Sequence, residues 1–359
     1  MRASAFRSGR LQVTEMPDPV PGSGQVLVRT IACGICGSDL HAREHFAEFA
    51  SFSGRVSGRD MLQADRPLVF GHEFSAEVLD YGPDTERVIP VGTTVCSMPM
   101  VLGAEGPEAI GYSHRYPGGF AEHMVLQEML LRPVPAGLDP LHAALTEPLA
   151  VGEHAVVRAD VQPGSVCVVV GCGPVGLAVI LALKSRGLGP VIAADFSPLR
   201  RRLAEQMGAD VVLDPGQDSP FDRWSQFGVP ATGMERSMAT MLGATPPDAV
   251  VFEAVGVPGV LESIVEGAAA QARVVVVGVC MEPDTFQPAI AITKELDVRF
   301  VLGYSDEEFT RTLQRLGEGK VDADALITTT VGLDDVESAF DALKHPDEQA
   351  KVLVRHAAG

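Results

Sequence analysis

Apolar and polar residues follow two different patterns in the two parts of the chain. Before residue 150, short apolar runs such as "QVLVRTIAC", "EFSAEVL" and "HMVLQEMLL" are separated by stretches rich in Pro and Gly, such as "PDPVPGSG". Runs of this kind are typical of strands, and the stretches between them are typical of turns. The pattern predicts a mostly-β domain over residues 1–150.

From residue 151 onward, apolar runs alternate with amphipathic segments. The stretch "SVCVVVGCGPVGLAVILALKSRG" predicts a strand, a glycine turn and a helix, and "PVIAAD", "DAVVFEAVG" and "ARVVVVGVC" predict further strands. Parallel sheets bury such continuous apolar runs on both faces, and their alternation with helices is typical of a doubly wound α/β domain. We predict this domain over residues 151–285 and expect residues 286–359 to return to the first domain.

Two segments fit neither pattern. Residues 41–70 form a long aromatic loop, which either shapes a substrate pocket or is a plain packed loop; the side chains that would line the pocket are His45, Phe46, Phe49 and Phe52. Residues 214–245 contain many turn-forming residues and the only Trp of the chain. We interpret them as an enlarged connection to which the sequence assigns no role.

Composition narrows the class of protein. With 359 residues, of which 46% are hydrophobic and 21% charged, the chain is globular and has the length of about two domains. A net charge of -19 leaves no excess of Lys and Arg for nucleic acid or for an anionic membrane. No signal peptide or bilayer-spanning run is visible, and the six cysteines are scattered. We therefore expect a cytoplasmic protein with reduced thiols.

A glycine motif follows the first strand of the predicted α/β domain. Gly171, Gly173 and Gly176 have the GxGxxG spacing between a strand and a helix, and Val175 lies among them. Such glycines allow a tight turn and bring a pyrophosphate to the helix N-terminus. Asp195 ends the second strand, where a carboxylate binds the ribose hydroxyls of NAD and repels the 2′-phosphate of NADP. Glycines can also form a mere turn, but the strand, helix and acid in register favour an NAD site.

Three residues far apart in the sequence have side chains that bind zinc. Cys36 offers a thiolate, His72 an imidazole and Glu147 a carboxylate. Three protein ligands and one exchangeable position are typical of a catalytic zinc, whereas a structural zinc has four protein ligands. Each residue taken singly is more often structural, because buried cysteines and hydrogen-bonded histidines are common. Only their joint context points to a metal.

That context resembles the zinc-dependent medium-chain alcohol dehydrogenase family, nearest its polyol, threonine and butanediol dehydrogenase branch. The motifs that carry the resemblance span almost the whole chain and are "CGICGSDLH", "GHEFSAEV", "GGFAEH", "EPLAVGEHA", "GCGPVG" with "AAD", and "FEAVG". The resemblance implies an α/β protein with a mostly-β, GroES-like catalytic domain and a Rossmann-type domain. It implies a zinc-dependent oxidoreductase that transfers a hydride between NAD and an alcohol/carbonyl pair, with a secondary alcohol or polyol expected.

The resemblance also assigns roles at the zinc. Cys36 and His72 are the expected thiolate and imidazole ligands, and the third ligand is either Glu73 or Glu147, a choice that the sequence leaves open. Asp39 is expected to orient His72 from behind. Cys33 matches a position that binds no metal in this family.

Further roles concern the cofactor and the proton. The resemblance places Arg200 at the adenosine ribose and Val277 and Val279 at the nicotinamide carboxamide. It implies that Ser38 accepts the proton of the alcohol and passes it by way of the nicotinamide ribose to His41, which can release it to solvent. Ser38 and Asp39 could equally be turn formers, and His41 a plain loop histidine.

One departure from the family concerns a second zinc. Many members bind a second, structural zinc through four closely spaced cysteines, whereas the matching stretch here contains only Cys96. We therefore expect one catalytic zinc per chain and no structural zinc. A homo-oligomer, either a dimer or a tetramer, is expected from the family.

Two alternatives stay open at this point. A zinc-free NADPH-dependent quinone or enoyl reductase could share the fold, although Cys36, His72, Glu147 and Asp195 argue against it. The chain could also be a non-catalytic binding protein, because fold alone never proves activity.

Overall fold

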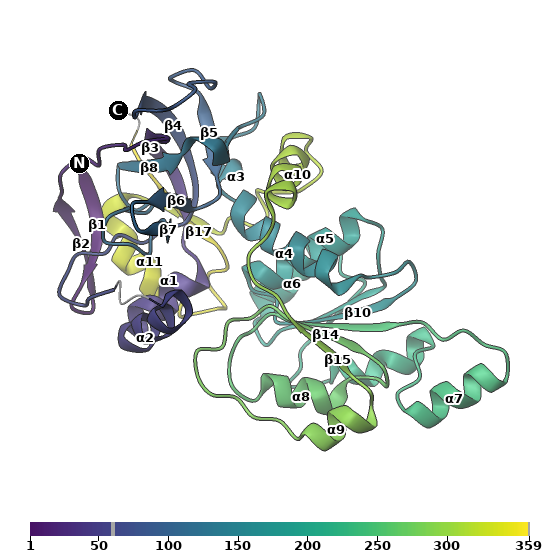
Figure 1. Ribbon diagram of the computed structural model, residues 1–359. Helices are drawn as coiled ribbons and strands as arrows, with labels where there is room; N and C mark the ends of the chain where they lie inside the picture. The colour runs from purple at the N-terminus through teal and green to yellow at the C-terminus, as the bar shows by residue number, and fades with distance from the viewer. Residues whose placement is uncertain (59–61, 358–359) are drawn as a thin grey trace. The chain divides into compact units, whose positions relative to one another are not determined.

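The computed structural model describes residues 1–58 and 62–357, and its described part divides into two compact units (Figure 1). The first unit comprises Met1–Glu147 and the chain from Phe309 onward, and the second comprises Pro148–Glu308. The return to the first unit therefore begins at Phe309 and not at residue 286 as predicted. The reason is that the segment before Phe309 still contributes a strand to the sheet of the second unit.

The first unit is built mainly of antiparallel strands, as its short apolar runs predict. Its largest sheet has the order β16-β17-β3-β4-β5-β9, and β8 pairs with β3 beside it. Two small hairpins, β1 with β2 and β6 with β7, complete the strands. The bounds are β1 Arg2–Arg7, β2 Arg10–Glu15, β3 Gln25–Gly34, β4 Glu73–Tyr81, β5 Thr94–Ser97, β6 Met100–Gly103, β7 Gly106–Ala109, β8 His123–Gln127, β9 Leu131–Pro133, β16 Thr329–Val331 and β17 Val352–Arg355.

Aromatic side chains from both ends of the chain fill the core of the first unit. The ring of Phe70 lies 5.4 Å from that of Phe6 and 6.5 Å from that of Phe340, and Phe120 meets Phe340 edge-on at 5.9 Å. All four side chains are buried. Because Phe340 belongs to the last helix of the chain, the C-terminal segment completes the core that the N-terminal strands begin.

The helices of the first unit include two that the pattern analysis treated as loop. Residues 41–70 contain the end of α1 and all of α2, so the expected loop is wrong for most of its described length. Phe46 of α2 stacks on Phe6 with ring centroids 5.2 Å apart. The bounds are α1 Gly37–Glu44, α2 Phe46–Ser57, α3 Pro140–Ala143, α10 Asp306–Gly317, which begins in the second unit, and α11 Val336–Ala342.

The second unit is the predicted doubly wound domain. Six parallel strands lie in the order β12-β11-β10-β13-β14-β15, with α5 and α6 on one face and α8 and α9 on the other (Figure 1). The bounds are β10 Val166–Val170, β11 Val191–Ala194, β12 Val211–Leu213, β13 Ala249–Glu253, β14 Arg273–Val276 and β15 Asp297–Phe300 for the strands, and α4 Thr146–Ala159, α5 Pro174–Ser185, α6 Pro198–Gln206, α8 Val260–Gly267 and α9 Pro288–Thr293 for the helices.

The enlarged connection over residues 214–245 is ordered. It contains a 3₁₀ helix, Pro220–Phe227, and the helix α7, Gly233–Met241. Trp224 inserts into the core beneath the sheet, and its indole N–H donates to the carbonyl of Gly267 at 3.1 Å. Trp224 is therefore a large buried anchor of the connection, and Val229 is buried beside it in the same core cluster.

The anchoring side chain gives a stability prediction. Trp224 is 2% exposed, so Trp224→Ala should lower the free energy of unfolding of the second unit by about 3–5 kcal/mol through loss of burial and creation of a cavity. Urea denaturation followed by circular dichroism measures this. Met234→Ala in α7, where the side chain is 78% exposed, is the control and should change stability by less than about 0.5 kcal/mol. Equal effects of the two substitutions would refute the anchoring role.

Candidate functional site

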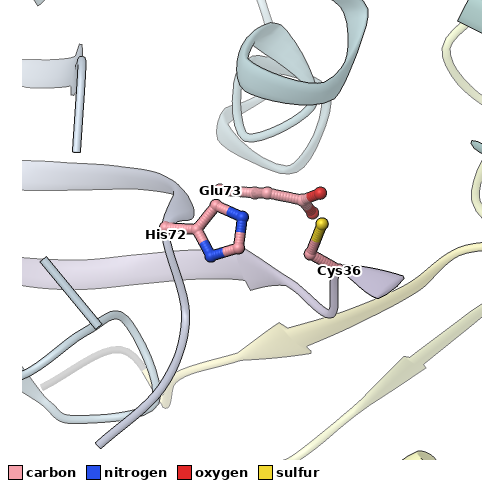
Figure 2. A group of neighbouring side chains, drawn as sticks. All are labelled: Cys36, His72 and Glu73. Atoms are coloured by element: carbon pink, nitrogen blue, oxygen red, sulfur yellow. The ribbon is translucent and has the colours of Figure 1, made fainter. Parts of the chain in front are cut away.

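Strand pairing brings three metal-binding side chains together. β3 and β4 run antiparallel with Gly34 opposite Glu73, so Cys36, two residues past the end of β3, lies beside the start of β4. The thiol of Cys36, a ring nitrogen of His72 and a carboxylate oxygen of Glu73 all lie within 4.8 Å of one another (Figure 2). Residues from two distant segments thus form one cluster.

The chemistry of this donor set fits zinc. A thiolate, an imidazole and a carboxylate are all common zinc ligands. Nδ1 of His72 lies 3.4 Å from Asp39 Oδ1, which leaves Nε2 facing Cys36 and Glu73 (Figure 2). Burial lowers the pKa of His72, but the negative charges of Asp39 and Cys36 outweigh burial and raise that pKa well above its ordinary value. The same negative charges favour a cation beside the ring.

Asp39 holds the first turn of α1 against the cluster. It is fully buried, and its Oδ2 accepts the backbone N–H of Cys36 at 3.1 Å. Its Oδ1 lies 3.4 Å from Nδ1 of His72 but makes no hydrogen bond to it, and this ring nitrogen has no hydrogen-bond partner in the described chain. The carboxylate therefore already lies where it can accept a proton from the ring nitrogen of His72.

A lysine that the sequence did not point to lies beside the cluster. Lys351, just before β17, forms an ion pair with Glu73, and its ammonium group also donates to the carbonyl of Ile35 at 3.1 Å. Both side chains of the pair are almost completely buried. Burial lowers the pKa of Lys351, but the charges of Glu73, Cys36 and Glu147 raise it overall. No sequence signal links Lys351 to Glu73, because only the pairing of β17 with β3 brings them together.

The two candidate glutamates differ in position. Glu73 belongs to the cluster of donor atoms, whereas Glu147, in the first turn of α4, does not belong to it. Glu147 nevertheless lies close enough for its charge to raise the pKa of Lys351.

The residues expected to handle the proton lie on α1. Ser38 Oγ is 2.9 Å from the hydroxyl of Tyr112, a residue that the sequence did not single out. His41 is half-buried, and burial, helped by the nearby charge of His45, lowers its pKa. His41 is therefore neutral at neutral pH and able to accept a proton.

The glycine motif in the second unit has the expected geometry. Gly171 has a φ of 90°, in the left-handed region, and a Cβ on Gly176 would lie 1.9 Å from the carbonyl oxygen of Gly171. Both positions therefore require glycine. Gly173 is the N-cap of α5, and Val175 is in the first turn of that helix. The turn and the helix N-terminus are thus arranged to receive a pyrophosphate.

Asp195 follows β11 beside this turn. Its carboxylate accepts the backbone N–H of Cys172 at 2.7 Å and that of Ser197 at 2.8 Å, which fixes its orientation. The guanidinium of Arg200 is 3.9 Å away from it. The acidic and basic groups expected at the adenosine ribose therefore lie side by side.

Glu253 links the ends of two further strands. Its carboxylate accepts the backbone N–H groups of Val255 and Gly256, and its own carbonyl accepts that of Val277. Val277 and Val279, the residues expected at the carboxamide, follow β14 in the segment held this way. The "FEAVG" motif contains Glu253, Val255 and Gly256, so its structural role is to hold the backbone at the ends of β13 and β14.

The comparisons with known proteins agree with this arrangement. Residues 22–136 match the family described as alcohol dehydrogenase GroES-like domain, and residues 174–318 match that described as zinc-binding dehydrogenase. (R,R)-butanediol dehydrogenase of Bacillus subtilis is 32% identical over 99% of both chains. Sorbitol dehydrogenase of the same species is 26% identical, covering 99% of this chain and 97% of that one.

A solved structure extends the agreement to three dimensions. The crystal structure of 2R,3R-butanediol dehydrogenase from B. subtilis superposes with a TM-score of 0.80 at 30% identity and covers 99% of each chain.

The chain belongs to the zinc-dependent medium-chain alcohol dehydrogenase family. It is an oxidoreductase that acts on alcohols. In the part of this dehydrogenase that the structure describes, no helix has the length and apolar character needed to cross a membrane.

The stretch without the four cysteines is held by hydrogen bonds in this dehydrogenase. Cys96 is buried, its thiol donates to the carbonyl of Ala143 at 3.2 Å, and burial raises its pKa to about 12. In the hairpin beyond it, Ser113 donates to the buried Glu108 at 2.6 Å. The nearby side chain of Gln25 donates to the carbonyl of Leu102 at 3.2 Å. These bonds hold this part of the chain together locally.

The buried ion pair beside the metal cluster gives a second prediction. In metal-free protein, Lys351→Met should lower the free energy of unfolding by about 3–5 kcal/mol, because it leaves the buried Glu73 carboxylate without its counter-charge. Chemical denaturation in the presence of a chelator measures this. Adding Glu73→Gln should restore most of the loss.

Lys344→Met is the matched control. Lys344 is 47% exposed and pairs with Glu44 at 3.5 Å, so its loss should cost less than about 1 kcal/mol. A similarly small cost for Lys351→Met would contradict the prediction.

Proposed function

We propose that this dehydrogenase oxidises a secondary alcohol or a polyol to the ketone with NAD, at a zinc ion held by Cys36, His72 and Glu73. The observation that supports it most is the convergence of a thiol, an imidazole and a carboxylate within 4.8 Å of one another. Ser38 lies two residues after Cys36, and the Tyr112 hydroxyl bridges it to Asp39, which faces His72. Glu73 is preferred to Glu147 as the resting carboxylate ligand because its oxygen belongs to the cluster.

The protein side chains supply proton handling and orientation. A bound zinc would polarise the alcohol oxygen, and bound NAD would accept the hydride from the carbinol carbon. Ser38 accepts the hydroxyl proton, and His41, whose lowered pKa keeps it neutral, takes it onward toward solvent. Asp39 orients His72. The reverse reaction uses the same groups with the protons moving in the opposite direction.

The substrate and the cofactor are inferred from different observations. Relatives named butanediol and sorbitol dehydrogenase favour a secondary alcohol, in particular one with a neighbouring hydroxyl. NAD is preferred to NADP because the fixed carboxylate of Asp195 would repel a 2′-phosphate. A zinc-free reductase on the same fold would have no need of the Cys36 cluster.

A paired substitution tests the metal assignment. Cys36→Ala should lose zinc and at least about a thousandfold in kcat/KM, because the thiolate ligand is gone. Cys33→Ala is the control: Cys33 is buried, its thiol donates to the carbonyl of Gly34, and burial raises its pKa well above the usual range, so zinc and activity should remain.

The assay is a screen of primary, secondary, vicinal and aromatic alcohols with NAD and with NADP, in which the absorbance of the reduced nicotinamide reports turnover. The metal content of each variant is measured in parallel. Full activity of Cys36→Ala, or of the wild type after exhaustive chelation, would refute the zinc mechanism. Faster turnover with NADP would refute the cofactor assignment.

We also propose that the protein is a homo-oligomer, a dimer or a tetramer, that acts in the cytoplasm. The free thiols of all six cysteines are compatible with a reducing compartment. At the edge of the parallel sheet, β15 has no outer neighbour among the described strands, and Phe300 and Leu302 there are 69% and 85% exposed. Exposed apolar residues along an open strand favour pairing with another chain.

Sedimentation velocity tests this association. The wild type should sediment as a dimer or a larger species at micromolar concentration, whereas Phe300→Lys should shift it toward the monomer, because a charge would be buried in the contact. Val88→Lys, at another exposed apolar position (74%), is the control and should leave the state unchanged. A monomeric wild type would disprove the proposal.

A further inference from the structure

Tyr112 lies outside α1 and contacts both Ser38 and Asp39 through a single atom. Its hydroxyl oxygen lies 2.9 Å from Ser38 Oγ and 2.8 Å from Asp39 Oδ1. It comes from the segment after β7, in the stretch where other members of the family carry the structural zinc. This stretch therefore contributes a functional group to the site.

The direction of the two hydrogen bonds follows from proton counting. A carboxylate only accepts, and a phenol carries one proton, so Tyr112 donates that proton to Asp39. The contact with Ser38 must then run the other way, with the Ser38 hydroxyl donating to Tyr112. The pKa of Tyr112 agrees: burial raises it well above its usual range, the bond to Asp39 raises it further, and the bond from Ser38 lowers it.

Three aromatic neighbours fix the ring that carries this hydroxyl. The ring centroid of Tyr112 lies 5.1 Å from that of Phe49 in α2, 6.1 Å from that of Phe70 and 5.3 Å from that of His72. Removing the hydroxyl alone would leave these contacts in place. The ring thus aims a single oxygen atom at the first turn of α1.

We propose that Tyr112 is a positioning residue that orders the hydroxyl of Ser38 for alcohol binding. Because Tyr112 accepts the Ser38 proton in a hydrogen bond, the lone pairs of Ser38 stay free, and Ser38 receives the substrate hydroxyl as an acceptor. For onward transfer, rotation about the Cβ–Oγ bond first turns the Ser38 proton from Tyr112 toward the next acceptor. Ser38 then gives up this proton as it takes that of the substrate, so its hydroxyl carries one proton before and after the step. The inference rests on the proposed function, in which Ser38 is the proton acceptor.

The test compares Tyr112→Phe with Ser38→Ala and with the double variant. Tyr112→Phe should raise the KM for the alcohol substrate about fivefold, which corresponds to the free energy of one hydrogen bond. It should change kcat by less than about twofold. In the Ser38→Ala background the same substitution should change nothing further, because the group it orders is absent. Tyr116→Phe, in the same stretch and bonded to Gln25, is the control and should match the wild type.

A second readout does not depend on turnover. tert-Butanol has a hydroxyl but no carbinol hydrogen, so it can bind and cannot be oxidised. Calorimetric titration of the zinc- and NAD-loaded protein should show about fivefold weaker tert-butanol binding for Tyr112→Phe, with zinc content unchanged.

The outcomes separate the two proposals. If no alcohol in the screen is oxidised, the proposed function fails. If alcohols are oxidised but Tyr112→Phe leaves both KM and tert-butanol binding unchanged, the role of Tyr112 fails. An equal effect of Tyr112→Phe with and without Ser38, or loss of zinc in Tyr112→Phe, would also overturn it, because Tyr112 would then act on the scaffold instead of on Ser38.

Discussion

The pairing of β3 with β4 and with β17 is the constraint on which the metal cluster depends. β4 on one side brings Glu73 opposite Gly34, and β17 on the other side brings Leu353 opposite the same Gly34. A Cβ on Gly34 would lie 2.0 Å from the Glu73 carboxylate. Because strand register is fixed by alternating burial, a slip by one residue would move every donor to the wrong face. The register of the paired strands therefore specifies the cluster, rather than the sequence immediately around each donor.

Charge balance explains why so many ionisable groups can be buried together. Asp39 and Glu73 are both buried next to Cys36 and His72, and Lys351 is the buried cation among them. Buried charges are tolerated only where opposite charges and hydrogen bonds compensate them. A divalent cation at the cluster would add its positive charge to that of Lys351 and compensate the buried carboxylates further. The same arrangement keeps the donor groups oriented before any metal arrives.

The stretch over residues 95–119, whose single cysteine is Cys96, reaches the first turn of α1 through Tyr112. Without four cysteines, it is held by the buried Glu108 with Ser113 and by the contacts of Gln25. Tyr112 reaches the first turn of α1 from this stretch. The stretch thus combines local hydrogen bonds with a hydroxyl group placed beside α1.

The sequence by itself determined the local elements and the chemistry that they carry. Apolar runs and glycine spacing predicted the parallel sheet and the turn at Gly171, because backbone conformation and burial leave direct marks on neighbouring residues. Only the tertiary structure decided that Glu73 joins Cys36 and His72, that Lys351 pairs with Glu73, and that Tyr112 reaches Ser38. Each of these contacts joins segments that are far apart in the chain. Long-range strand register and packing create them, so the sequence around one partner does not reveal the other.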